Sequence, residues 1–309
     1  MTAAIQAENL VKIYSKSAKS AEKKALEGLS LTIPKGSMFA LLGPNGAGKS
    51  TFINILAGLA RKTSGRVVID GLDIDADRIE SKRRVGIVPQ EINIDPFFTP
   101  REALEMHAGL YGVPEKKRRT DEILAALGLS DKANAYARSL SGGMRRRLMV
   151  AKALVHTPPI LILDEPTAGV DVELRQQLWA YVRELNRGGT TVVLTTHYLE
   201  EAEELCDTVA IINKGALVAL DSVPNLLAKV QHKTLVVQLT EPIAALPEVL
   251  LAEGFTLDAK GLKASLSYDP AVKPMDGILR VLSSAALPFR DMSIAAPSLE
   301  DVFLAVTKS

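Results

Sequence analysis

Three short runs of aliphatic residues stand out along the chain. They read SMFALLG at 37–43, PILILD at 159–164 and TVVLTTH at 191–197. Nearly unbroken Leu, Ile and Val over about four to eight residues is typical of a β-strand that is buried on both faces. Between the last two runs, Leu174, Leu178 and Val182 recur at helical spacing. Strands that alternate with a helix in this way predict a mostly parallel sheet, and so an α/β fold.

The pattern becomes helical between residues 91 and 157. TPRE offers Thr99 as the residue before a helix, Pro100 as its first residue and Glu102 as the partner of Thr99 in a capping box. A glycine and a proline in LYGVPEKKRRT interrupt the pattern, which then resumes. We therefore expect a helical insert in the α/β domain, at about 91–157.

A second domain is predicted to begin near residue 223. SVPNLLAKVQHK, at 222–233, reads as a short helix that leads out of the first domain. Three strand candidates follow, TLVVQLT, KASLSY and FRDMSI, and they alternate with helical stretches near 246–251, 275–282 and 298–306. This mixed order predicts a small α+β domain. The expected domains are thus 1–222 and 223–309, and the role of the second is left open.

The composition is ordinary for a globular protein. Of the 309 residues, 47% are hydrophobic and 24% are charged, and the formal net charge is +1. So small a net charge gives no general attraction to nucleic acid or to a membrane surface. The single cysteine, Cys206, cannot form an internal disulfide and fits a reducing cytoplasm. No apolar run approaches the ~18 residues of a membrane span, so we expect the chain not to cross a bilayer.

A glycine-rich loop follows the first aliphatic run and precedes a helical pattern. Its spacing, a glycine, four residues and then Gly-Lys-Ser, is that of a P-loop. In such a loop the backbone amides surround phosphates, the lysine reaches the β- and γ-phosphates, and the serine hydroxyl binds Mg²⁺. The candidate ATP-binding residues are Gly43, Pro44, Asn45, Gly46, Ala47, Gly48, Lys49, Ser50 and Thr51, with Ser50 also a Mg²⁺ ligand. The first domain is therefore expected to be a P-loop NTPase.

Side chains suited to hydrolysis follow the other aliphatic runs. Asp164 is placed to hold Mg²⁺, and Glu165 is placed to orient or deprotonate the attacking water. An isolated Asp-Glu pair more commonly just leaves a strand for a solvated loop, but a P-loop upstream favours the catalytic roles. His197 ends the third run, where it can contact the γ-phosphate. Gln90, at the end of GIVPQ, can reach Mg²⁺ or water. Taken alone, either of these last two residues could be structural.

A second glycine stretch, LSGGMRRR at 140–147, also precedes a helical pattern. Ser141, Gly142 and Gly143 could cap an anion, because a serine hydroxyl, accessible amides and a helix N-terminus all favour one. They could equally form a plain N-cap before an amphipathic helix. The P-loop amides already surround the α- and β-phosphates, so any further donor at the γ-phosphate must come from elsewhere.

Together these motifs resemble the ATP-binding subunits of ABC transporters. LLGPNGAGKST resembles the Walker A motif of that family, ILILDEP its Walker B and LSGG its signature, in the same order along the chain. Gln90 resembles the Q-loop residue, Asp171 in GVD that of the D-loop, His197 the switch histidine, and Tyr14 the aromatic residue that stacks on adenine. The resemblance implies a homodimer in which each signature loop closes over the ATP, with its Mg²⁺, that the other copy holds.

The resemblance also implies where the protein works. Such subunits are peripheral ATPases on the cytoplasmic face of the inner (cell) membrane, where they drive a separate integral-membrane permease. SLEDVFLAVT, at 298–307, resembles the ending of subunits that serve ABC-2 type exporters, which implies export. The insert at about 96–111 is the expected permease-facing surface, because Gln90 links it to the γ-phosphate. The cargo contacts the permease, so this chain does not name it.

Two motifs depart from the family pattern. Met144 stands where the commoner LSGGQ has glutamine, and the D-loop reads GVD instead of SALD. Met144 lies beyond the residues that would contact phosphate, so we expect the signature loop to keep its role. The lysine-rich stretch at 16–24 has no assigned role.

Two other classes of protein also contain a P-loop. The first is a soluble ABC-type ATPase acting on nucleic acid or ribosomes, but the chain has a single cassette and no strongly basic domain, so no nucleic acid partner is expected. The second is a P-loop kinase for a small molecule, which leaves LSGG and His197 without a purpose.

Overall fold

A computed structural model of the chain describes residues 2–15, 23–168, 170, 172–229, 233–270, 272–285, 287–295 and 297–307. Asp171, with most of the D-loop motif, and residues 16–22 of the lysine-rich stretch lie outside the described residues. The chain divides into two compact units, one of Met1–Val223 with Val306–Ser309 and one of Pro224–Ala305. Val306 and Thr307 thus group with the first unit, whereas the predicted boundary near residue 223 puts them in the second.

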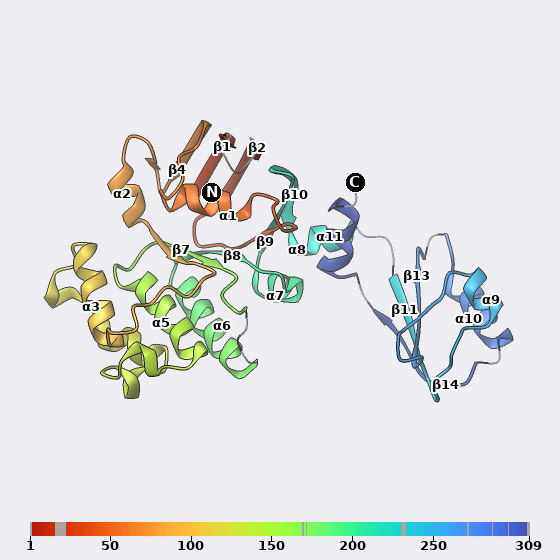
Figure 1. Ribbon diagram of the computed structural model, residues 1–309. Coiled ribbons are helices and arrows are strands. Elements are labelled where there is room, and N and C mark those ends of the chain that lie inside the picture. Colours follow the sequence, from red (N-terminus) through yellow and green to blue (C-terminus); the bar gives the residue numbers. More distant parts are fainter. Residues whose placement is uncertain are drawn as a thin grey trace. The chain divides into compact units, whose positions relative to one another are not determined.

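Six strands form the central sheet of the first unit, in the order β10-β9-β3-β8-β7-β6 (Figure 1). They are β3 (Met38–Leu42), β6 (Val85–Val88), β7 (Ile160–Asp164), β8 (Thr191–Thr195), β9 (Thr208–Asn213) and β10 (Ala216–Ser222). All pairs are parallel except that of β10 with β9. Every residue of β3, β7 and β8 is buried, as continuous aliphatic runs require. The predicted mostly parallel α/β fold is confirmed.

A second, antiparallel sheet of the first unit has the order β2-β1-β4-β5. Its strands are β1 (Ala3–Tyr14), β2 (Lys23–Pro34), β4 (Ser64–Ile69) and β5 (Leu72–Asp73), and the helices nearby in sequence are α1 (Lys49–Leu56) and α2 (Arg78–Arg83). One hydrophobic cluster joins this sheet, α1 and the central sheet through Ile5, Leu29, Phe52, Phe39 and Val193. Burial of each such side chain contributes about 1.5–3 kcal/mol. The sequence pattern did not predict this sheet.

Helices fill the segment between β6 and β7. They are α3 (Pro100–Leu110), α4 (Thr120–Ala126), α5 (Gly142–Leu154) and the short 3₁₀ helices Glu115–Lys117, Ser130–Lys132 and Ala137–Ser139. The capping box at the start of α3 is present, because the Glu102 amide donates to the Thr99 hydroxyl and the Thr99 amide donates to the Glu102 carboxylate. α6 (Val172–Arg187) and α7 (Leu199–Leu205) flank β8 in sequence. Figure 1 shows α1 on one side of the central sheet and α5 and α6 on the other.

The second unit has its own antiparallel sheet, in the order β12-β13-β11-β14. Its strands are β11 (Lys233–Leu239), β12 (Thr256–Leu257), β13 (Lys263–Tyr268) and β14 (Phe289–Ala295), and the helices in this part of the chain are α8 (Val223–Ala228), α9 (Glu248–Ala252), α10 (Met275–Ser284) and α11 (Leu299–Thr307). A separate cluster that includes Leu235, Leu250, Leu266 and Ile278 forms its core. A small α+β unit therefore has a core of its own.

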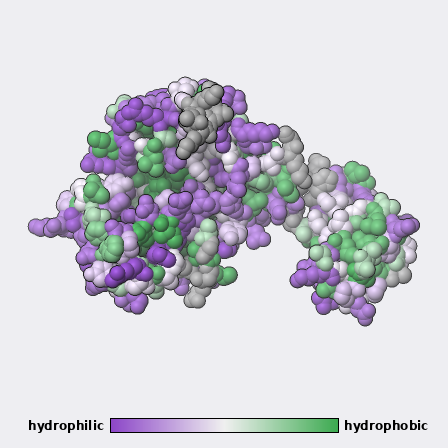
Figure 2. All heavy atoms as spheres, viewed as in Figure 1, coloured by the Kyte–Doolittle hydropathy of each residue, from purple (hydrophilic) through white to green (hydrophobic). Residues whose placement is uncertain are grey.

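The apolar residues of the first unit are mostly interior. On the face drawn in Figure 2, hydrophilic side chains cover most of this unit and hydrophobic ones form small separate groups. Among the described helices, none combines the length and the apolar character that a membrane crossing needs.

Candidate functional site

Four strand ends bring the predicted site residues to one edge of the central sheet. Strands β3, β8, β7 and β6 are parallel neighbours, so their carboxyl ends lie along the same edge, where α/β folds bind ligands. Gly43 follows β3 and Asp164 ends β7. His197 stands shortly after the end of β8, and Gln90 stands shortly after the end of β6. The chain thereby assembles residues that are far apart in sequence.

A cavity of about 260 Å³ lies at this edge. It is lined by Tyr14, Lys23, Ala25, Asn45, Gly46, Ala47, Gly48, Lys49, Ser50, Thr51, Gln90, Glu165 and His197. The structure therefore brings the predicted adenine-stacking tyrosine, the P-loop and three predicted catalytic residues to one place. Lys23 and Ala25, from β2, were not predicted, because nothing in their local pattern indicates a phosphate.

The P-loop is folded tightly against its surroundings. A Cβ added at Gly48, where φ is +113°, would come within 2.7 Å of the Ala25 carbonyl oxygen. One added at Gly43 would come within 2.3 Å of the Ile212 carbonyl oxygen. At Gly46, with φ +81°, no atom of the described residues beyond its chain neighbours lies within 4 Å of that position. Glycine is thus required at the first two positions by close packing, and at the third by the left-handed backbone.

Lys49 is the first residue of α1 and is buried. Its ammonium donates to the carbonyl oxygens of Gly43 at 2.6 Å and Pro44 at 3.3 Å. Burial lowers the pKa of the Lys49 ammonium, and the nearby Glu165 and Asp164 carboxylates oppose that shift. The lysine is therefore a partly desolvated cation at the cavity wall, which suits a phosphate.

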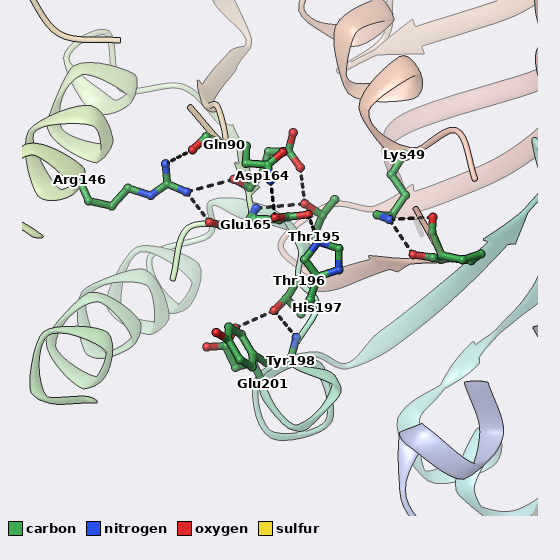
Figure 3. Close-up of polar contacts among 12 residues, drawn as sticks. Lys49, Gln90, Arg146, Asp164, Glu165, Thr195, Thr196, His197, Tyr198 and Glu201 are labelled. Carbon is green, nitrogen blue, oxygen red and sulfur yellow. Dashed lines mark hydrogen bonds and ion pairs between the residues drawn. The ribbon is translucent and has the colours of Figure 1, made fainter. Parts of the chain in front are cut away.

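Glu165 is the centre of a short polar network (Figure 3). Its carboxylate accepts a hydrogen bond of 2.7 Å from the side-chain amide of Gln90. The same carboxylate lies 2.5 Å from Nε2 of His197. The backbone of Glu165 is left-handed, with φ +50°, a conformation that costs about 1–3 kcal/mol in a residue other than glycine. Its amide donates to the carbonyl oxygen of Thr195 at 3.0 Å. The surrounding structure thus holds this carboxylate in a fixed direction.

The residues proposed for Mg²⁺ offer oxygen atoms, as that ion requires. Asp164 is 8% exposed, and its Oδ1 accepts a 2.5 Å hydrogen bond from the Thr195 hydroxyl. Ser50 and Gln90 line the cavity. Among the described residues, no three His, Cys, Asp or Glu side chains are grouped to hold a metal. Mg²⁺ bound with a nucleotide needs only one or two protein oxygens beside phosphates and water, so these residues fit the ion.

Two buried ionic residues near the site were not predicted from the sequence. Arg146, in α5, is 3% exposed and donates to the main-chain carbonyl oxygens of Glu165 and Gln90. Burial lowers the pKa of its guanidinium. Glu201, in α7, accepts from the hydroxyls of Thr167 at 3.0 Å and Thr196 at 2.9 Å. Both residues stand in runs of like charge, which resemble solvated helix faces, so the local sequence gave no signal for them.

The second glycine stretch starts α5. Ser141 is the N-cap, and its hydroxyl accepts from the Met144 amide at 3.2 Å. Ser141 and Gly142 are exposed, and within the described part of the chain a Cβ at Gly142 would meet no atom within 4 Å outside its own helix backbone and chain neighbours. The described lining of the P-loop cavity contains neither these two residues nor Gly143. The predicted N-cap is present, and it presents a helix start to the outside of the chain.

The ABC transporter family profile matches residues 26–168. The linearmycin resistance ATP-binding protein LnrL of Bacillus subtilis is 35% identical, with 98% of each chain covered. The daunorubicin/doxorubicin resistance ATP-binding protein DrrA of Streptomyces peucetius is 37% identical over 99% of this chain and 93% of its own. A Nod factor export ATP-binding protein of Ralstonia nicotianae is 36% identical over 93% and 90%.

Solved structures of ATP-binding cassettes have the same fold as much of the chain. An ATP-binding subunit of an ABC transporter has a TM-score of 0.67 and 27% identity over 74% of this chain and 93% of its own. A dimeric cassette in a post-hydrolysis state with ADP and Pi has a TM-score of 0.65 and 29% identity over 71% and 98%. The chain therefore belongs to the ATP-binding proteins of ABC transporters, and within that family to the ATPases of the exporter type.

Proposed function

We propose that two copies of this chain enclose two ATP molecules between them, and that ATP hydrolysis drives a separate membrane permease in export. The observation that supports this proposal is that one chain keeps its hydrolysis residues and its signature residues in two separate places. Gln90, Glu165 and His197 meet at the P-loop cavity, whereas Ser141 and Gly142 are exposed at the start of another helix. A second copy, placed head to tail, would bring those exposed donors to the γ-phosphate.

The P-loop side binds most of the nucleotide in this proposal. Backbone amides of residues 45–50 point donors at the phosphates, and the first turn of α1 adds a favourable dipole. Lys49 would exchange its carbonyl partners for the β- and γ-phosphates. Tyr14 is 40% exposed at the end of β1, where its ring can stack on adenine. The Lys12 ammonium lies over one face of that ring, 4.6 Å from its centre, so adenine would stack on the opposite face.

Hydrolysis in this proposal depends on Glu165. The carboxylate is the general base for the attacking water, since it lies at the cavity and is fixed by its neighbours. Gln90 and His197 already contact that carboxylate, so both are placed to reach the water and the γ-phosphate. Ser50, Asp164 and Gln90 would hold Mg²⁺, which neutralises phosphate charge during the transfer.

The partner copy completes the site. Its Ser141 hydroxyl and the first amides of its α5 would donate to the γ-phosphate, an anion that a helix N-terminus favours. Groups supplied in trans at this position can contribute about 10³ to 10⁵ in rate. Asp171 is proposed for the same interface from its motif alone. A lone chain would accordingly hydrolyse ATP slowly.

The direction of transport follows from the relatives. Their names concern resistance to linearmycin and daunorubicin and the export of Nod factor. They match nearly the whole of this chain, the C-terminal unit included, so we extend export to it. The permease would hold the ATPase at the cytoplasmic face of the cell membrane, with the helices that follow Gln90 facing it.

Two variants separate binding from hydrolysis. Glu165→Gln keeps the shape of the base without its basicity, so turnover should fall about 10²- to 10⁴-fold while ATP binding persists and an ATP-bound dimer accumulates.

Lys49→Ala removes a charged donor worth about 1.5–3 kcal/mol, so nucleotide binding itself should weaken roughly ten- to a hundredfold. Size-exclusion chromatography with and without ATP, beside a nucleotide-binding assay, measures both.

Lys49→Ala serves as the matched control, because it should remain monomeric at the ATP concentration that dimerises Glu165→Gln. A Glu165→Gln protein that binds ATP and still elutes as a monomer at saturation would refute the shared site.

A further inference from the structure

Three arginines follow the signature glycines, and their side chains have different surroundings. Arg145 is exposed, and Arg147 donates to the carbonyls of Leu127 and Gly128 within the helical insert. Arg146 is buried and is directed at the nucleotide site (Figure 3). The function proposed above assigns no role to any of the three.

The Arg146 guanidinium uses all of its donors. Its five N–H groups have five acceptors, and every acceptor is a main-chain carbonyl oxygen. These are Pro166 at 2.9 Å from Nε, Pro89 at 2.9 Å and Gln90 at 2.8 Å from Nη1, and Asp164 at 3.3 Å together with Glu165 from Nη2. A buried cation is tolerated only when it is paired or fully hydrogen-bonded, and this one is fully hydrogen-bonded.

The five acceptors belong to two segments that carry the hydrolysis groups. One is the loop that holds Gln90, and the other is the turn at Glu165. Since the Glu165 backbone is left-handed, the turn persists only because its neighbours hold it, and Arg146 binds the carbonyl on that residue and on both residues beside it. The side chains of Gln90 and Glu165 then meet at 2.7 Å. One guanidinium thus fixes both backbones behind this contact.

Arg146 also belongs to the helix that would act on the other nucleotide. It lies five residues after Ser141, or about 7.5 Å along α5 at 1.5 Å per residue. A helix of this length moves as a rigid rod over so short a distance, so a displacement of its start reaches the guanidinium directly.

We propose that Arg146 is a positioning residue that couples the two ATP sites of the dimer. In each copy it connects the signature end of α5, which contacts the partner's ATP, to Gln90 and Glu165, which act on the copy's own ATP. This rests on the proposed function, because the coupling exists only if the signature acts in trans. Closure over one nucleotide then sets the geometry for water activation at the other.

Arg146→Lys tests the coupling, because it keeps the charge but cannot replace the planar fork. A lysine donates from a single nitrogen, so it cannot span both segments. We expect ATP binding to the P-loop within about twofold of the parent, and a fall in kcat of about a hundredfold, since a misplacement of about 1 Å can cost that much. The Hill coefficient for ATP should fall to about 1. Arg147→Lys is the matched control, and it should leave kcat and the Hill coefficient unchanged.

A purely structural role gives a different result. It would lower Tm and the folded fraction, while kcat per folded chain and the Hill coefficient stayed at parental values, and that outcome overturns the proposal. If Arg146→Lys does not fold, Arg146→Gln, with a planar group and two donors, is judged by the same criteria.

The Glu165→Gln background separates the two proposals. Arg146→Lys combined with Glu165→Gln should still dimerise with ATP, because the signature donors remain. If Glu165→Gln alone dimerises while Arg146→Lys turns over with parental kcat and cooperativity, only the coupling fails. If Glu165→Gln does not dimerise, the shared site itself fails.

Discussion

Gly142 is a residue at which the folding of one chain and the contact between two chains can be tested separately. It is the first residue of α5 and is exposed, and among the described residues an added methyl group would meet no atom within 4 Å beyond its chain neighbours and its own helix backbone. In the proposed dimer the same methyl would stand between the signature amides and the partner's phosphate. A residue that is neutral for folding would then be costly for assembly.

We therefore predict that Gly142→Ala leaves Tm and nucleotide binding by the monomer unchanged or slightly improved, because alanine favours a helix over glycine. ATP-driven dimerisation and turnover should each fall about tenfold or more, since a close contact is lost. Thermal unfolding, a binding assay and steady-state ATPase rates measure these effects. Gly109→Ala, at an exposed glycine of α3 with only an ordinary contact to Arg118, is the control and should keep the parental rate. Parental turnover in Gly142→Ala would contradict the assigned surface.

Site residues could be predicted where their residue type and their spacing along the chain indicate their chemistry. The P-loop, Glu165 and His197 were predicted as site residues in this way, and they line one cavity. Arg146 and Thr195 were not predicted as neighbours of the site, because Arg146 reaches it through main-chain carbonyl oxygens and Thr195 lies on a neighbouring strand. No local pattern encodes such a partner.

At the scale of elements, continuous aliphatic runs predicted β3, β7 and β8 well, since a strand buried on both faces has no polar positions. The antiparallel sheet was missed for a physical reason. The pairing of β1 with β2 shifts register several times between Ala3 and Ile13, and each shift breaks the alternation of buried and exposed positions. A search for a period of two therefore fails on these strands.

The contact between the helical insert and the central sheet includes a half-buried histidine. His156 stacks on Tyr111, the C-cap residue that follows α3, with ring centres 3.7 Å apart, and its Nε2 lies 3.3 Å from the Val85 carbonyl oxygen. Burial is the main cause that lowers the pKa of His156 from 6.5 to about 4, and the Val85 contact opposes it. The imidazole is thus neutral in the folded protein at neutral pH.

This shift makes stability depend on pH. The unfolded chain binds a proton at His156 near pH 6.5 and the folded chain only near pH 4, so the free energy of unfolding falls as pH falls between these values. His156→Phe keeps a ring for Tyr111 and removes the titration, so its loss of stability from pH 7 to 5 should be smaller than that of the parent. Urea unfolding at a series of pH values measures both slopes. Equal slopes would show that His156 is not responsible.

At the scale of the whole molecule, the chain contains two units with separate cores. The family profile falls within the first, whereas LnrL matches 98% of the chain. The C-terminal unit is therefore shared with exporter-type relatives. Its existence could be predicted from alternating strand and helix patterns, but its role could not, because it contains no motif with a defined chemistry.

The central claim is that each working ATP site is built from two chains. Glu165→Gln damages the P-loop side of a site, and Ser141→Ala damages the signature side, while both variants should still bind ATP. A mixed dimer contains one site with both defects and one site with neither, because the intact Glu165 and the intact Ser141 meet across the interface.

Mixing the two purified variants at equal concentration and measuring the ATPase rate is the most direct test. We predict that the mixture hydrolyses ATP much faster than the sum of the two variants measured alone, and that the gain disappears on dilution as dimers dissociate. A mixture that forms mixed dimers with ATP and is no faster than that sum would contradict a site shared between chains.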